Sequence, residues 1–253
     1  MSSHTPENVR DLLEMAARTL NLPDAPGVSQ GRQFDLEGIT LDGEGGFWLA
    51  SEGRSDRLIP HALYHVDAEG KILAEVAFPE ALLPSEIRFG AEGVAKVGST
   101  LWVAIQREWK DDPKGQVKLL GYDTEAKTWS AVRYPLEAPA EGAWNGLSEI
   151  TAHGDYVYIV ERDNQIAGKA LHKKVYRVPV AELVGAEIGG DLPVVSKELV
   201  RDLVPDLAMS QGYIVDKVES LAIAADGTAY AITDNDGIDD SSGETFFWSF
   251  KLD

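Results

Sequence analysis

Four short segments of the chain share one pattern, in which an acidic residue stands near the start of an aliphatic run. They read Leu36-Glu37-Gly38-Ile39-Thr40, Ala91-Glu92-Gly93-Val94-Ala95, Leu147-Ser148-Glu149-Ile150-Thr151 and Val218-Glu219-Ser220-Leu221-Ala222. An alignment without gaps matches Ser148, not Glu149, to Glu37, so both remain candidates. Carboxylates that converge in a pocket of low dielectric repel one another, which raises their pKa values unless a cation or an arginine lies among them. We therefore expect Glu37, Glu92, Glu149 and Glu219 to bind a metal ion.

The expected ion is Ca²⁺, or alternatively Mg²⁺. The chain has no cysteine, and its five histidines do not have the spacing of a zinc site. Hard oxygen ligands favour these two cations over zinc. The segment 234–240 is acidic enough to resemble a calcium loop, but Ile238 stands where such a loop needs a ligand.

A second polar set follows an aromatic-led apolar run in each repeat. The four sets are Glu52-Gly53-Arg54, Gln106-Arg107-Glu108, Glu161-Arg162-Asp163 and Asp234-Asn235-Asp236. We predict that Glu52, Glu161 and Asp234 are the candidate catalytic acids or bases. Arginine forks suit phosphate and carboxylate groups, so Arg54, Arg107 and Arg162 are candidates for binding a small anionic substrate.

Two histidines join these candidates. His61 and His172 each begin the third apolar run of a repeat, after the loop that carries an arginine. Either could act as an acid or base at the rim, and His61 is included among the substrate-binding candidates. The same residues could also have purely structural roles. The acids would then be solvated turn residues, the arginines would form ion pairs with them, and the histidines would lie on the surface.

The repeats also predict the elements that position these residues. Each acidic segment is separated by a turn signal such as Asp42-Gly43 from the aromatic-led run, which predicts a β-hairpin. A third apolar run follows in every repeat, and the first three repeats have a fourth at Ile72 to Phe78, Thr128 to Tyr134 and Leu199 to Leu203. Tandem sets of four short antiparallel strands indicate an all-β fold, a β-propeller with at least four blades.

The propeller geometry brings the two polar sets to one rim. In an antiparallel hairpin the start of the first strand lies beside the end of the second. Because the first strand of each blade lines the axis, the acidic segments should face the mouth of the central channel, with the second set just outside it. The aromatic residues Trp48, Trp102, Tyr158 and Tyr230 recur at one position, where we expect them to pack between blades.

The chain divides into an N-terminal segment, 1–33, and one propeller domain, 34–253. The last repeat ends at Asp253 without a fourth strand. Residues 8–13 resemble residues 199–204 and so could supply a closing strand, whereas Thr5-Pro6 and the apolar spacing after it favour a short helix. Both alternatives, and the number of blades, remain open.

Composition excludes several classes of function. The 42 acidic and 23 basic residues give a formal charge of −19, which disfavours binding to nucleic acid or to anionic membranes. The first 25 residues lack the basic start and apolar stretch of a signal peptide, so the location of the protein in the cell stays open.

The order of the motifs resembles the phytase-like family, also described as esterase-like activity of phytase. The resemblance runs from about residue 34 to the end and rests on Asp35-Leu36-Glu37-Gly38-Ile39, Ser51-Glu52-Gly53-Arg54, Ala91-Glu92-Gly93-Val94-Ala95, Val160-Glu161-Arg162, Val218-Glu219-Ser220-Leu221-Ala222 and Thr233-Asp234-Asn235. It implies a propeller, often exported to the periplasm or secreted, that hydrolyses phosphate or other esters. Members are expected to carry a leader and an opening blade, and because the first residues of this sequence match neither expectation, ring closure and localisation stay open.

The residues and the resemblance together favour a metal-assisted hydrolase of phosphate or other esters. A lactonase of the gluconolactonase-like propeller type is an alternative, with Asn145 or Asn164 joining Glu37 and Asp234 around the ion. A propeller that binds a protein or glycan without catalysis is the third interpretation.

Overall fold

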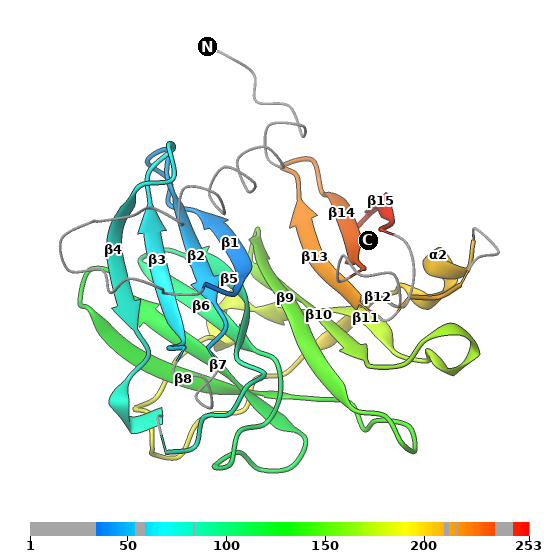
Figure 1. Cartoon of the computed structure of the whole chain (residues 1–253), viewed down its shortest axis with the longest axis horizontal. Coiled ribbons are helices and arrows are strands. Elements are labelled where there is room, and N and C mark those ends of the chain that lie inside the picture. The colour runs from blue at the N-terminus through cyan, green and yellow to red at the C-terminus, as the bar shows by residue number, and fades with distance from the viewer. Residues whose placement is uncertain are drawn as a thin grey trace.

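The computed structural model describes residues 34–53, 59–82, 84–209, 213–215, 217–235 and 245–252, which fold into the four blades of a β-propeller (Figure 1). The strands of blade 1 are β1 (Leu36–Leu41), β2 (Phe47–Ser51), β3 (Ala62–Val66) and β4 (Ile72–Ala77). Those of blade 2 are β5 (Ala91–Val97), β6 (Thr100–Ile105), β7 (Gln116–Asp123) and β8 (Thr128–Pro135). Blade 3 has β9 (Asn145–His153), β10 (Tyr156–Asp163), β11 (Lys173–Pro179) and β12 (Glu198–Asp202), and blade 4 has β13 (Lys217–Ile223), β14 (Thr228–Asp234) and β15 (Phe247–Lys251).

Among the described residues, helical structure is confined to short connections. These are the 3₁₀ turns η2 (Glu80–Leu82), η3 (Ala167–Lys169) and η4 (Val180–Glu182), and the helix α2 (Val204–Ala208), which has Pro205 in its first turn. No helix among the described residues is long and apolar enough to cross a membrane.

The predicted all-β propeller is confirmed, and so is the strand order within each blade. Every described sheet is antiparallel, with its strands in sequence order from the first strand outward. The three predicted fourth strands are β4, β8 and β12, within two residues of the expected bounds. Blade 4 has three strands among the described residues, and the proposed N-terminal helix or closing strand lies outside them.

The first strands of successive blades pack on one another around the axis. Strand β5 contacts β1 on one side and β9 on the other, and β9 contacts β13. This packing is close because small residues face each other: a Cβ atom on Gly38 would lie 2.7 Å from the Cα atom of Gly93. The arrangement gathers the starts of β1, β5, β9 and β13 near the centre of the molecule (Figure 1).

Apolar clusters fill the spaces between blades. Trp48 packs in the cluster between blades 1 and 2, Trp102 in that between blades 2 and 3, and Tyr158 in that between blades 3 and 4. These three residues confirm the predicted role of the repeated aromatic. Tyr230 does not pack between blades as predicted. It is 38% exposed and stacks on Phe247 of its own blade, with ring centroids 5.9 Å apart.

Candidate functional site

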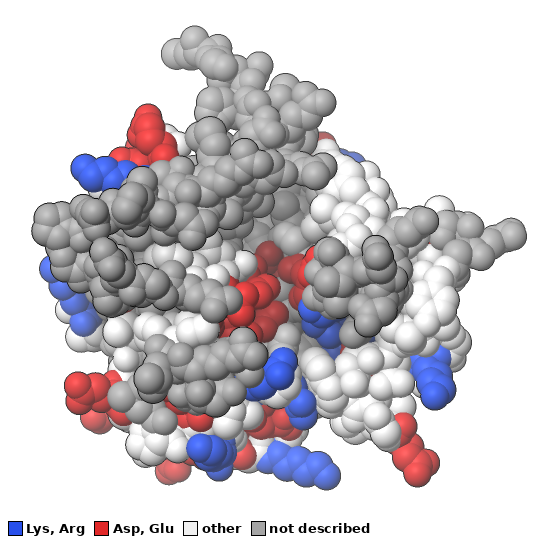
Figure 2. Space-filling model, viewed as in Figure 1, with Lys and Arg blue, Asp and Glu red and all other residues white. Residues whose placement is uncertain are grey.

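One mouth of the channel holds a pocket to which all four blades contribute. Its volume is about 430 Å³, and acidic side chains gather in the hollow at the centre of the face in Figure 2, with basic side chains beside them. The lining residues are Asp35, Glu37, Glu52, Arg88, Phe89, Glu92, Gln106, Trp144, Arg162, Lys217, Glu219 and Asp234. The structure therefore brings together three of the four predicted metal ligands, Glu37, Glu92 and Glu219.

A repeated β-bulge explains why these three acids point into the pocket. In each of blades 1, 2 and 4 the register of the first hairpin shifts across the acidic residue, between Leu36 and Gly38, between Ala91 and Gly93, and between Val218 and Ser220. A bulge adds one unpaired residue and redirects its side chain. The bulged residues are Glu37, Glu92 and Glu219.

Blade 3 carries the same bulge with a different residue. Leu147 pairs with Glu161 and Glu149 pairs with Val160, so Ser148 is the bulged residue. Ser148 Oγ donates a hydrogen bond to the carbonyl of Val218 at 2.5 Å. The ungapped alignment is thus the correct one, and Glu149 occupies the position of Gly38 and Gly93 instead.

Glu149 is buried outside the pocket. One carboxyl oxygen accepts a hydrogen bond from the Ile150 amide at 2.8 Å, and the other accepts one from Ser220 Oγ at 3.3 Å. Burial raises its pKa well above the usual range, despite these bonds. The buried carboxyl fills the space left by Gly93, where a Cβ atom would stand 2.5 Å from Glu149 Oε1.

Glu92 is the most unusual acid of the pocket. It is only 5% exposed, and it forms no hydrogen bond or ion pair with any part of the chain that the structure describes. Burial raises its pKa well above the usual range, and Glu219, Glu37 and Glu52 raise it further, while Arg162 opposes them. A buried carboxyl without a partner favours uptake of a proton or of a cation.

Glu37 shares this electrostatic environment from a more open position. The pKa of Glu37 is raised to about 8. Desolvation is the largest cause, and repulsion from Asp35, Glu219 and Glu52 adds to it. The residue as a whole is exposed, so its carboxyl is accessible from the pocket although protein surrounds it on other sides. With this pKa, Glu37 is mostly protonated at neutral pH.

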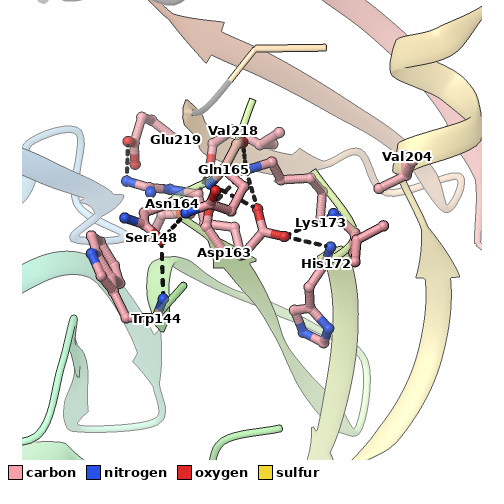
Figure 3. A network of polar contacts seen from close by, with 12 residues as sticks. Trp144, Ser148, Asp163, Asn164, Gln165, His172, Lys173, Val204, Val218 and Glu219 are labelled. Atoms are coloured by element: carbon pink, nitrogen blue, oxygen red, sulfur yellow. Dashed lines mark hydrogen bonds and ion pairs between the residues drawn. The ribbon is translucent and has the colours of Figure 1, made fainter. Parts of the chain in front are cut away.

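Arg162 and Glu219 form an ion pair in the pocket wall. Arg162 Nη2 lies 2.6 Å from Glu219 Oε1, and both side chains are largely buried (Figure 3). The other carboxylate oxygen, Glu219 Oε2, is buried and accepts no hydrogen bond from the described residues. Arg162 thus supplies the cation that the clustered acids require, while one oxygen of Glu219 remains available.

Glu52 anchors the loop before β5. Its Oε1 accepts a hydrogen bond from the Gly90 amide at 2.7 Å. Desolvation raises its pKa, and Asp35 adds to this, while the amide bonds from Gly90 and Phe89 oppose the shift. Glu52 lines the pocket as a half-buried carboxyl.

His61 lies beneath this loop, outside the pocket. The Gly53 amide donates to its Nδ1 at 2.8 Å, so the neutral ring donates from Nε2 to the Ile87 carbonyl at 3.1 Å. Burial lowers its pKa to about 4. The ring is too enclosed to reach a substrate, because a Cβ atom on Gly90 would stand 2.0 Å from it. His61 therefore positions the loop.

Glu161 and His172 also lie away from the pocket. Glu161 is fully buried, and its carboxylate accepts hydrogen bonds from the Glu137 amide at 2.7 Å, from Lys197 Nζ at 2.6 Å and from Tyr134 Oη at 3.1 Å. His172 Nε2 stands 3.1 Å from the same carboxylate. Although burial raises the pKa of Glu161, these partners outweigh it and lower the pKa. Glu161 is an ionised structural group between blades 2 and 3.

Of the remaining predicted site residues, some line the pocket and others do not. Asp234 lines the pocket at its exposed edge, 4.0 Å from Lys217 Nζ. Arg107 is not among the lining residues, and its guanidinium lies over the rings of Phe89 and Trp144. Arg54 and residues 236–240 lie outside the described residues. The amide ligands of the lactonase alternative, Asn145 and Asn164, do not line the pocket; Asn145 Nδ2 donates to Glu137 O, and Asn164 Oδ1 accepts from the Trp144 amide.

Sequence reasoning missed five lining residues: Asp35, Arg88, Phe89, Trp144 and Lys217. Two of them had a usable signal, because Asp35 and Lys217 stand two positions before a bulged acid and alternate residues of a strand share a face. The other three belong to loops that precede β5 and β9, where strand periodicity gives no information.

The donor set of the pocket fits a hard divalent cation in charge and chemistry. In the part of the chain that the structure describes, the Glu92 carboxyl and Glu219 Oε2 have no hydrogen-bonding partner, so both offer carboxylate oxygens. Within the described ranges no three acidic or histidine side chains stand at the mutual separation of a preformed metal cluster. The metal prediction therefore remains a prediction.

Comparison with known proteins identifies the family. No curated protein matches the chain. A family model described as phytase-like, with the esterase-like activity of phytase, matches residues 5–237. That match and the four-bladed architecture together support a hydrolase-like propeller. The chain belongs to the phytase-like family.

Proposed function

We propose that this protein is a hydrolase of phosphate or other esters, assisted by a divalent cation, and that the four-blade pocket is its active site. The observation that carries the proposal is Glu92, a nine-tenths-buried carboxyl that lines the pocket and forms no hydrogen bond or ion pair with the described residues. Keeping such a group in a fold costs free energy unless a proton or a ligand stabilises it. Perturbed acids in a cleft are a recurrent property of catalytic sites.

Glu37, Glu92 and Glu219 are the proposed ligands of Ca²⁺, or of Mg²⁺. All three stand on bulges that aim them at one pocket, and Glu219 keeps one oxygen free of hydrogen bonds. When bound there, the cation would polarise the ester and lower the pKa of a coordinated water.

The charge of the pocket suits a bound cation better than an anion alone. Six lining residues are acidic, Asp35, Glu37, Glu52, Glu92, Glu219 and Asp234, and three are basic, Arg88, Arg162 and Lys217. The formal lining charge is thus three minus six, or −3, when all are ionised. Arg162 is occupied by Glu219, which leaves the exposed Arg88 as the described cation best placed to meet an incoming anion.

A general base is available at the edge of the pocket. Asp234 is exposed there, so it reaches solvent water directly. Glu52 is the second candidate, although its carboxylate already accepts hydrogen bonds from the loop before β5. Glu161 is not proposed for this role because it is fully buried in its ion-pair network.

Turnover of a panel of esters tests this proposal. An aryl phosphate, a phosphodiester, an aryl acetate and a lactone are offered to the protein, first in EDTA and then with millimolar Ca²⁺ or Mg²⁺. We expect turnover of at least one ester that requires the cation and falls by 100-fold or more in Glu92→Gln, whereas the exposed Glu44→Gln control keeps the parental rate. No turnover with any cation would favour the propeller that binds without catalysis.

A further inference from the structure

Phe89 adopts a backbone conformation that its residue type disfavours. Its φ angle is 70°, in the left-handed region that glycine and asparagine enter readily and that a bulky residue enters at a cost. Phe89 is nevertheless one of the residues that line the pocket. A residue that carries backbone strain beside a cleft is a reason to look for a function of its side chain.

The surrounding structure holds this strained loop from three sides. Trp109 Nε1 donates to the Phe89 carbonyl at 3.2 Å, and His61 contacts the Ile87 carbonyl at 3.1 Å. The Gly90 amide is bound by Glu52 at 2.7 Å. These contacts fix the backbone independently of the phenyl ring, so the fold of the loop does not require an aromatic residue at position 89.

Trp144 stands beside Phe89 in the pocket wall. The two ring centroids are 5.9 Å apart, and the planes are inclined by 55°. The Trp144 amide donates to Asn164 Oδ1 at 3.0 Å, and the Asn164 amide donates back to the Trp144 carbonyl at 3.2 Å (Figure 3). Trp144 is therefore anchored to the end of β10.

Arginines fix the orientation of both rings. The Arg107 guanidinium lies 4.9 Å from the Phe89 centroid and 4.5 Å from the Trp144 centroid. Arg88 lies 4.5 Å from the Phe89 centroid, and Arg162 lies 5.7 Å from that of Trp144. Such cation–π contacts attract a guanidinium group to a ring and help to hold the ring in place. Both aromatic residues remain half-buried, so part of each stays accessible.

We propose that Phe89 and Trp144 form an aromatic platform that binds a planar, apolar ring of the ligand, so that the preferred ligands are anionic esters with an aryl group. The exposed Arg88, 4.5 Å from the Phe89 ring centroid, places positive charge next to the platform, where the phosphate or carboxylate would lie. The proposal deepens the proposed function and rests on it for the reaction, but ring binding can be measured without turnover. Stacking on one aromatic side chain is worth roughly a 2- to 10-fold gain in affinity.

Calorimetric titration with phenyl phosphate and ethyl phosphate, in millimolar Ca²⁺, tests the platform. We expect the parent to bind phenyl phosphate about 3- to 10-fold more tightly than ethyl phosphate. Phe89→Asn and Trp144→Leu should each bring this ratio close to one. The matched control is Phe247→Asn, which removes a phenyl ring that is 63% exposed on blade 4 and should leave the ratio unchanged.

Thermal unfolding of the same variants separates loss of the platform from loss of the fold. Asparagine tolerates the left-handed region, so Phe89→Asn should unfold at the parental temperature or above it. Equal binding of both probes by the parent, no measurable binding of phenyl phosphate, or a preference that survives both pocket substitutions would each overturn the proposal. If the protein binds phenyl phosphate more tightly than ethyl phosphate but hydrolyses no ester, the proposed reaction is wrong and the aromatic platform is still supported.

Discussion

Gly38 and Gly93 pack backbone against backbone at the centre of the propeller. A Cβ atom on Gly38 would stand 2.7 Å from Gly93 Cα and 2.8 Å from the Val94 amide nitrogen. This contact lets β1 and β5 approach closely enough for the bulged acids Glu37 and Glu92 to share one pocket. The small residue after each acid is therefore as much a part of the motif as the acid.

Gly38→Ala should destabilise the protein by about 1–3 kcal/mol, because the added methyl group meets backbone atoms that cannot move aside independently. Chemical denaturation of parent and variant measures this. Gly168→Ala is the control, since nothing lies within 4 Å of a Cβ atom there. Equal losses of stability in the two variants would show that close packing at the axis is not the cause.

The repeated pattern was sufficient to predict the blades but not the chemistry of every repeat position. Strand alternation and turn signals identify the hairpins because those signals are local. Whether Ser148 or Glu149 is the bulged residue depends on the register with β10, and register is a tertiary property. The same residue type, glutamate, consequently serves as a pocket acid in Glu92 and as buried packing in Glu149.

The second polar set illustrates the same limit. Glu52 comes directly after β2 and Glu161 lies near the end of the equivalent strand β10, yet Glu52 lines the pocket and Glu161 does not. The difference comes from Lys197 and His172, which surround Glu161 from later parts of the chain. Partners supplied by distant segments cannot be read from a repeat, and neither can Phe89 and Trp144, which lie in irregular loops.

Glu161→Gln should cost about 2–3 kcal/mol of stability, because the largely buried Lys197 would lose its shorter ion pair, at 2.6 Å, and keep only the half-exposed Glu137, at 3.3 Å, as a counterion. The control is Glu198→Gln, which breaks an exposed ion pair with Arg177 and should cost no more than about 1 kcal/mol. Urea denaturation at neutral pH compares the two. A loss for Glu161→Gln as small as that for the control would contradict the structural role given to Glu161.

The raised pKa of Glu37 predicts a specific dependence of stability on pH. A carboxyl whose pKa rises from 4.5 to about 8 on folding binds more protons in the folded state, so its contribution to stability is lost as pH rises through the folded pKa. His61, whose pKa is lowered to about 4, acts in the opposite direction only up to the ordinary histidine pKa of about 6.5. Between about pH 6.5 and 8, the pH dependence of stability therefore comes from the carboxyls with raised pKa values and not from His61.

In that window, with EDTA present, the free energy of unfolding of the parent should fall as pH rises. Glu37→Gln should show a shallower fall, and the exposed control Glu44→Gln should follow the parent. Denaturant titrations at intervals of half a pH unit provide the measurement. Parallel curves for the parent and Glu37→Gln would mean that this carboxyl does not titrate between the two states as described.

Thermal unfolding in EDTA and then in millimolar Ca²⁺ tests the central claim, that the bulged acids form a cation site. A ligand that binds only the folded state stabilises it by about 2.7 kcal/mol at a concentration of 100 times its dissociation constant. We predict that Ca²⁺ raises the unfolding temperature of the parent, and that Glu92→Gln and Glu219→Gln each abolish most of the rise while Glu44→Gln keeps it. A rise that survives both pocket substitutions, or no rise at all with calcium in excess, would contradict the assignment of the ion to Glu92 and Glu219.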